Sequence, residues 1–174
     1  MKITDLKSYL MKIKWDDRSG SVEPRNLVER EFVFVQIYTD EGITGWGECS
    51  DGRSPRGVSG TIEDLKPVLI GQDPREFETR FWDMFRATRQ SPGGIAAKAL
   101  AGLDCAFIDI KAKSLGISVA ELFGGPTRDR VRVYWSHCGS SRVRNHELIG
   151  VPPLLAVSYT HLRAHETLRY LGCG

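Results

Sequence analysis

Two stretches within the first fifty residues place apolar residues at the spacing of a β-strand. Val33, Val35 and Ile37 alternate with aromatic and polar residues, a period of two that predicts a strand with one buried face. The segment Asp40–Gly42 predicts a turn, because glycine adopts positive φ at little cost. The stretch Glu31–Glu48 is therefore expected to form a β-hairpin.

A second strand is expected from Lys2 to Lys14, with an irregularity near Asp5, paired with this hairpin in one antiparallel sheet. Two polar segments rich in glycine, serine and proline interrupt the pattern, Trp15–Asn26 and Cys49–Ser59. A connection as long as the first is either a lid or plain surface. The second is either a solvated turn or a substrate-facing loop that offers the guanidinium of Arg53.

The apolar period lengthens to that of a helix after residue 60. Thr61 is expected to cap a helix that stops at Gly71, and Asp73-Pro74 has the form of a second helix start. A long alanine-rich helix is expected from Ile95 to Lys113. The remaining expected elements are a short helix opened by a Ser118/Glu121 capping box and a strand from Arg130 to Ser136.

Composition narrows the class of protein. The chain of 174 residues is 41% apolar and 26% charged, ordinary values for a soluble globular domain, and its net charge of +2 gives no argument for nucleic acid. No apolar run approaches 18 residues, so no membrane span is expected. No signal-peptide core is present either, and a cytoplasmic location is expected. The four cysteines form no CxxC pair and are expected to be free thiols: Cys49, Cys105, Cys138 and Cys173.

Candidate chemistry from single residues is sparse. His137 and Cys138 are adjacent on the expected strand and would point to opposite faces, so they cannot act as base and nucleophile. Asp104 and Asp109 flank the long helix and could be catalytic acids. Buried helix partners or surface charges are the favoured interpretation of both.

Three motifs together resemble a known family: YTDEGITGWGE, GGIAAKALAGLDCAFIDIKAKSLGISVAELFGG and VRVYWSHCG. Over Met1–Leu154 the chain is similar to the capping domain and first barrel strand of the enolase superfamily, mandelate racemase/muconate lactonizing enzyme type. The resemblance implies an α+β fold, a three-stranded antiparallel sheet followed by a helical bundle, with the first strand of an incomplete (β/α)8 barrel. The expected domains are 1–125, the capping domain, and 126–156, the start of a truncated barrel.

The resemblance also implies a chemistry. Its members hold Mg²⁺ with three carboxylates at barrel strand ends and use lysine or histidine bases to abstract the proton α to a carboxylate. Nothing after Gly139 offers those residues, so no catalytic, metal or cofactor residue is assigned, and the fragment is expected to be inactive. The parent is expected to be a homo-oligomeric sugar-acid dehydratase. A lactone cycloisomerase, a racemase and a non-catalytic α+β interaction module remain alternatives.

Substrate contacts are expected from two loops and one strand end. The resemblance implies that the segments 15–26 and 48–59 close over the barrel mouth and select a carboxylate-bearing substrate. YWSHC here resembles YDSHS of mandelate racemase, which makes Ser136 the first substrate-contact candidate, followed by Trp15, Arg18 and Arg53. Trp135 stands where that motif has aspartate, so the substrate stays open.

The last residues have no structural pattern. Val157–Thr167 reads VSYTHLRAHET, which resembles one translated frame of a transposon-type sequencing adapter. The segment 157–174 is therefore interpreted as a non-native tail. His161 and His165 stand four residues apart, a spacing that suits zinc on a helix, but the adapter resemblance explains them better.

Overall fold

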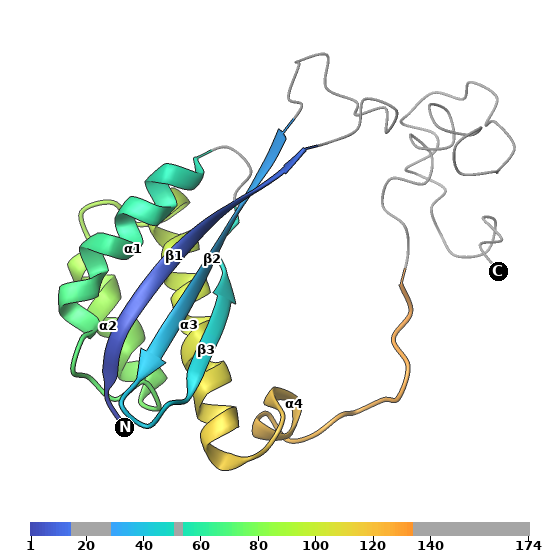
Figure 1. Cartoon of the computed structure of the whole chain (residues 1–174). Helices are drawn as coiled ribbons and strands as arrows, with labels where there is room; N and C mark the ends of the chain where they lie inside the picture. The colour runs from blue at the N-terminus through green and yellow to red at the C-terminus, as the bar shows by residue number, and fades with distance from the viewer. Residues whose placement is uncertain (15–28, 51–53, 134–174) are drawn as a thin grey trace, which may run out of the picture. The chain divides into compact units, whose positions relative to one another are not determined.

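A computed structural model describes residues 1–14, 29–50 and 54–133. It divides into two units, Met1–Lys14 with Glu29–Asp129, and Trp15–Val28 with Arg130–Gly174. The first unit contains all the helices and strands of the described residues. In chain order they are β1 (Ile3–Lys14), β2 (Glu29–Thr39), β3 (Thr44–Glu48), α1 (Pro55–Leu69), α2 (Phe77–Ala87), α3 (Gly94–Leu115) and α4 (Val119–Leu122) (Figure 1).

The three strands form the expected antiparallel sheet, in the order β1-β2-β3. The predicted irregularity is confirmed, because the β1–β2 register shifts between Ile3 and Asp5. The predicted turn is confirmed as well: Gly42 has φ +78° and its N–H donates to the Thr39 carbonyl at 3.2 Å. The Thr39 hydroxyl also donates to the Ile43 carbonyl at 2.7 Å, which ties the two strands together at the turn.

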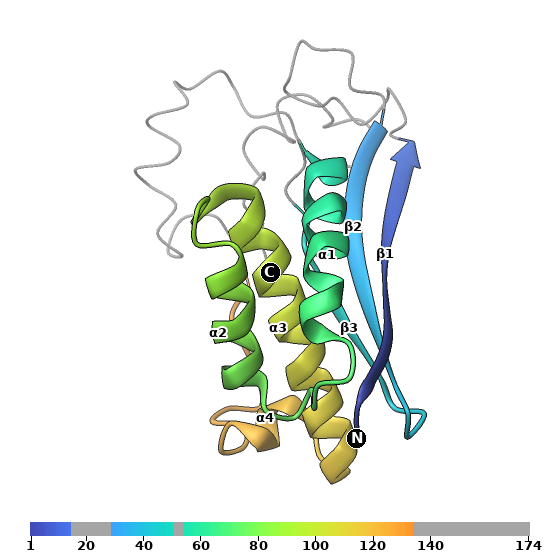
Figure 2. The ribbon, with the colours of Figure 1, turned by 90° about the vertical axis from the view of Figure 1, so that its left-hand side faces the viewer.

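Among the described residues, helices cover one face of the sheet. Val33, Val35 and Ile37 of β2 are fully buried, as their alternation predicts, and the helices lie against this face (Figure 2). Phe32 and Phe34, on the opposite face, are only half-buried. The alternation of residues along β2 therefore corresponds to the one sheet face that the helices cover.

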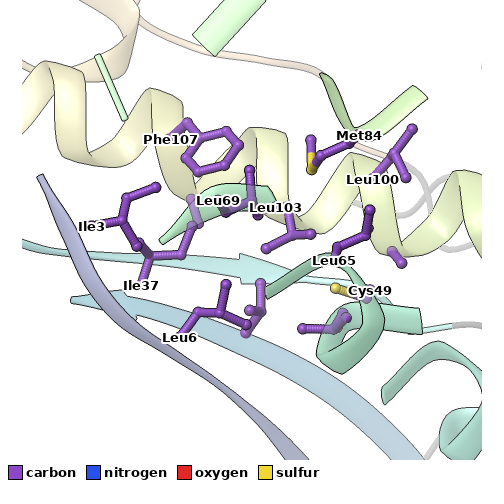
Figure 3. Packing of buried hydrophobic residues seen from close by; sticks show 14 of the residues in the cluster. Ile3, Leu6, Ile37, Cys49, Leu65, Leu69, Met84, Leu100, Leu103 and Phe107 are labelled. Carbon is purple, nitrogen blue, oxygen red and sulfur yellow. The ribbon is translucent and has the colours of Figure 1, made fainter. Parts of the chain in front are cut away.

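The core lies between this sheet face and the helices (Figure 3). Leu65 and Leu69 of α1 and Leu103 and Phe107 of α3 are buried there, and Met84 is the contribution of α2. Burial of each such side chain contributes roughly 1.5–3 kcal/mol. A single hydrophobic cluster therefore joins the sheet to all three long helices.

The backbones of β3 and α3 approach each other closely, and the approach depends on glycine. A Cβ atom on Gly47 would overlap the Gly102 carbonyl oxygen and lie 2.8 Å from its carbonyl carbon. A Cβ on Gly45 would overlap the Ala106 carbonyl oxygen and lie 2.6 Å from Cγ1 of Ile110. Glycine at these positions therefore lets strand and helix backbones touch.

Cys49 packs into the same contact, directly after β3. A Cβ on Gly102 would overlap the Sγ atom of Cys49, so the thiol fills the space that a side chain at position 102 would occupy. Burial, the largest cause, together with the nearby Cys105 and Glu48, raises the pKa of Cys49 from 9.0 to about 11. The neutral thiol is thus favoured in the folded chain, and this contribution to stability is fully present below pH 9 and lost as the pH rises through 11.

Two helix starts differ from the prediction. Helix α1 begins at Pro55, six residues before Thr61, because proline suits the first turn and Val58, Ile62 and Leu65 form one buried stripe. Thr61 does not cap the helix; its hydroxyl donates to the Gly57 carbonyl at 2.9 Å. The predicted loop Cys49–Ser59 is correspondingly shorter.

Helix α2 begins at Phe77, four residues after the predicted cap Asp73. Asp73 instead accepts from the backbone and the side chain of Arg75, at 2.9 Å from the backbone nitrogen and 2.6 Å from Nη2. This local pairing lowers the pKa of Asp73 to about 2. The carboxylate that would cap the helix is therefore used in the turn before it.

The long helix and the short helix agree with the prediction. Helix α3 ends with Gly116 in the left-handed conformation, φ +68°. Helix α4 opens with the predicted capping box: the Glu121 N–H donates to Oγ of Ser118 at 3.1 Å, and the Ser118 N–H donates to Oε2 of Glu121 at 2.7 Å.

The expected strand Arg130–Ser136 is not formed in its described part, residues 130–133. Val131 and Val133 are 71% and 86% exposed. A barrel strand is held by hydrogen bonds to a neighbour on each side. Residues 134–136 lie outside the described part of the chain, and the predicted domain limits at 125 and 156 stay predictions.

Replacement of Gly47 by alanine is expected to destabilise the chain by about 3 kcal/mol, because the new methyl group would force α3 away from β3. Chemical denaturation measures the change. Gly60→Ala in α1 is the matched control, since a Cβ there meets nothing within 4 Å, and it is expected to add roughly 0.5–1 kcal/mol of stability. Equal stability of the two variants would contradict the glycine contact.

Cys49 is expected to react with iodoacetamide at least about tenfold more slowly than the exposed Cys105 at pH 8, because the reactive thiolate is suppressed by burial. Mass-spectrometric mapping of the labelled peptides over time measures both rates in one sample. The rate at Cys49 should rise as the pH approaches 11. Comparable rates at pH 8 would show that the thiol is not held in the β3–α3 contact.

Candidate functional site

The four predicted substrate contacts, Trp15, Arg18, Arg53 and Ser136, lie outside the described residues. Whether these four side chains lie close together therefore stays a prediction. The structure does describe the ends of the two predicted substrate loops. These ends determine where each loop leaves the folded unit.

The first loop leaves from the tip of a two-stranded ribbon. Strand β3 ends at Glu48, which pairs with Phe34, whereas β1 and β2 continue pairing as far as Lys14 and Glu29 (Figure 1). Met11 is 53% exposed on this extension. The predicted loop 15–26 thus begins at the far end of a projecting hairpin.

The second loop leaves from a well-anchored strand end. The Cys49 N–H donates to the Val33 carbonyl at 2.8 Å, and the Val33 N–H donates to the Ser50 hydroxyl at 3.3 Å. The Ser50 side chain thus takes the place of a backbone acceptor and extends the β2–β3 ladder by one bond. On the other side, the chain re-enters regular structure at Pro55, the first residue of α1. Only residues 51–53 of this loop are not described, so Arg53 has a rigid neighbour two positions along the chain.

The two acids weighed as catalytic candidates belong to α3. Asp109 accepts a hydrogen bond from the Trp46 N–H at 3.0 Å and pairs with Lys113 at 2.7 Å, and its side chain is 27% exposed, so it forms a partly exposed structural ion pair. Burial, followed by the charge of Glu78, raises the pKa of Asp104.

The described residues do not fit the magnesium site that the resemblance implies. Among residues 1–14, 29–50 and 54–133, no group of three or more histidine, cysteine, aspartate or glutamate side chains is placed to hold a metal ion. In the same residues, no helix is long and apolar enough to cross a bilayer.

The burial of Arg80 was not predicted from the sequence. Its side chain is 5% exposed between α2 and the turn after α1, where Nη1 donates to Oε1 of Gln72 at 2.5 Å and Nη2 lies 3.2 Å from Asp83. A buried guanidinium needs such partners. The spacings of Asp83, three residues along the helix, and of Glu76, four residues before, are sequence signals that could have indicated the ion pairs of Arg80.

Comparisons with known proteins agree with this fold. A family model described as the mandelate racemase/muconate lactonizing enzyme N-terminal domain matches residues 20–124. The D-galactonate dehydratase of Verminephrobacter eiseniae is 38% identical over 134 residues, which cover 77% of this chain and 31% of that protein. The D-galactonate dehydratase of Ralstonia pickettii is 37% identical over 164 residues, which cover 94% of this chain and 38% of that protein.

Solved structures give the same result. A putative L-alanine-DL-glutamate epimerase from Burkholderia xenovorans bound to magnesium and fumarate superposes with a TM-score of 0.69 at 35% identity, over 88% of this chain and 34% of that one. A 3,6-anhydro-D-galactonate cycloisomerase from Zobellia galactanivorans has a TM-score of 0.64 at 26% identity, over 74% and 33%.

The chain spans about a third of the length of the curated relatives that it matches. Its three-stranded antiparallel sheet followed by helices matches the capping domain expected from the three motifs. Since the family model covers more than half of the residues, the chain belongs to the mandelate racemase/muconate lactonizing enzyme family of the enolase superfamily and carries its N-terminal domain.

Proposed function

We propose that this chain is the capping domain of an enzyme that dehydrates a sugar acid. The observation that carries the proposal is its 37–38% identity to D-galactonate dehydratases over 77% and 94% of its length. Identity at this level along a domain that contributes substrate loops supports a related substrate class, a polyhydroxy acid with one carboxylate.

The proposed role of the domain is to close the reaction chamber and choose the substrate. Arg18 and Arg53 would pair with the carboxylate or hydroxyl groups of the sugar acid, Trp15 would exclude water, and Ser136 would contact a substrate hydroxyl. The hydrogen-bonded bases of both loops support this role, because a loop selects among similar substrates only when its ends are held.

The proposed reaction is a β-elimination. The proton α to the carboxylate leaves, the hydroxyl group on the next carbon departs as water, and the resulting enol becomes a 2-keto-3-deoxy acid. A divalent metal would stabilise the charge on the substrate carboxylate. The described residues supply no metal site, so the contribution proposed for this domain is binding, orientation and exclusion of water.

Cycloisomerisation and epimerisation are the second candidate class. The solved structures of the Zobellia galactanivorans cycloisomerase and the Burkholderia xenovorans epimerase share this domain. Both reactions begin with loss of the same α proton but release no water. The product, not the fold, distinguishes them.

The reaction is tested with the product of the source gene read beyond Leu154, incubated with Mg²⁺ and a panel of sugar acids. Formation of a 2-keto-3-deoxy acid is expected with D-galactonate or a close stereoisomer. The 174-residue chain alone is expected to form none. An isomer of unchanged composition as the product would favour the second class, and no turnover of any acid by the longer product would favour a non-catalytic module.

The loops are tested by grafting residues 1–125 onto the barrel of the Ralstonia pickettii D-galactonate dehydratase. In this chimera Arg53→Ala is expected to lower kcat/KM for D-galactonate about tenfold or more, because a charge-assisted hydrogen bond to substrate is lost. Arg56→Ala is the matched control, an exposed arginine three residues along in α1, and is expected to change kcat/KM by less than about twofold. Equal effects of the two substitutions would remove Arg53 from the substrate site.

A further inference from the structure

Strand β3 forms one margin of the sheet, and half of its backbone groups point away from β2. The Cys49 N–H is directed at β2, where it donates to the Val33 carbonyl. In an antiparallel pair, alternate residues direct both backbone groups to the same side. Thr44, Trp46 and Glu48 therefore direct their N–H and C=O groups outward.

Two side chains of α3 bind this outer margin. Oδ2 of Asp109 accepts from the Trp46 N–H at 3.0 Å, and Nζ of Lys113 donates to the Thr44 carbonyl at 2.9 Å. The two side chains also pair with each other at 2.7 Å, one helical turn apart. One carboxylate and one ammonium thus occupy a donor and an acceptor that a neighbouring strand would otherwise use.

The glycine contact is what brings these side chains within reach. Gly45 and Gly47 let the α3 backbone lie directly on β3, as both views of the ribbon show (Figures 1 and 2). An aspartate side chain is short, and it can accept from a strand N–H only across such a small separation. The helix therefore lies along the margin of the strand as well as on its face.

The margin needs this protection because its surroundings favour association. Trp46 is 45% exposed, and its ring lies 5.6 Å from that of Tyr9 on the uncovered sheet face. Unpaired strand edges beside exposed aromatic residues are templates for addition of another strand. Charged side chains on an edge are a common means of preventing it.

We propose that Asp109 and Lys113 close the outer edge of β3 against strand addition by a second copy of this chain. The pair competes directly for the backbone groups that intermolecular pairing would need. An incoming strand would also have to desolvate the charged groups of Asp109 and Lys113, which opposes its binding. The proposal concerns the folded domain alone and does not depend on the reaction proposed above.

The test compares D109A/K113A with E63A/R86A in the 174-residue chain. The control removes one acidic and one basic side chain from α1 and α2 and leaves the charge balance equal. Sedimentation of the edge variant is expected to give about twice the average mass of the control as the concentration rises. Hydrogen exchange at the Trp46 amide should be at least about tenfold faster than in the control at low concentration and should slow as copies associate.

Two results would overturn the proposal: equal masses for the two variants at every concentration, or association that leaves the Trp46 amide unprotected. The conservative variant D109N/K113R keeps an acceptor and a donor in place and is expected to sediment as the parent chain does. If the double variant does not fold, the single substitutions D109A and K113A carry the same comparison, with faster Trp46 exchange expected in D109A alone.

Discussion

The contact between β3 and α3 is the constraint on which the rest of the domain depends. Three glycines, Gly45, Gly47 and Gly102, remove the side chains that would hold strand and helix apart, and the buried thiol of Cys49 fills part of the space. This approach sets the depth at which Leu103 and Phe107 enter the core. It also brings Asp109 to the margin of the sheet. Packing, edge protection and the base of the second loop are thus consequences of one backbone contact.

Features governed by local rules could be predicted from the sequence. The alternation through Val33 and Ile37, the turn at Gly42 and the capping box at Ser118 each involve residues within a few positions of one another. The two helix starts that differ from the prediction also depend on local interactions. Pro55 occupies the first turn of α1, and Asp73 accepts from Arg75 instead of capping α2. In both cases two local interactions competed, and composition alone does not rank them.

The remaining features depend on which segments meet in space. Nothing in the neighbourhood of Arg80 indicates burial, because its partner Gln72 belongs to a turn that packs against it only in the folded unit. From the sequence alone, Asp109 is an ordinary acidic residue of a helix, because its contact with the Trp46 N–H of β3 depends on the fold. Of the candidate substrate residues, Arg53 is indicated by the composition of its loop and the set as a whole by resemblance to a family, and all four lie outside the described residues. Their roles therefore stay predictions.

The extension of β1 and β2 beyond β3 has an evolutionary consequence. Five residue pairs, from Leu10–Val33 to Lys14–Glu29, separate the last pair shared with β3 from the point where the first loop departs. Insertions or deletions in that loop therefore occur beyond these pairs and remove no contact of the buried cluster. The sequence and length of this connection can therefore change with little loss of thermodynamic stability, so variation there is separated from the residues that fold the domain.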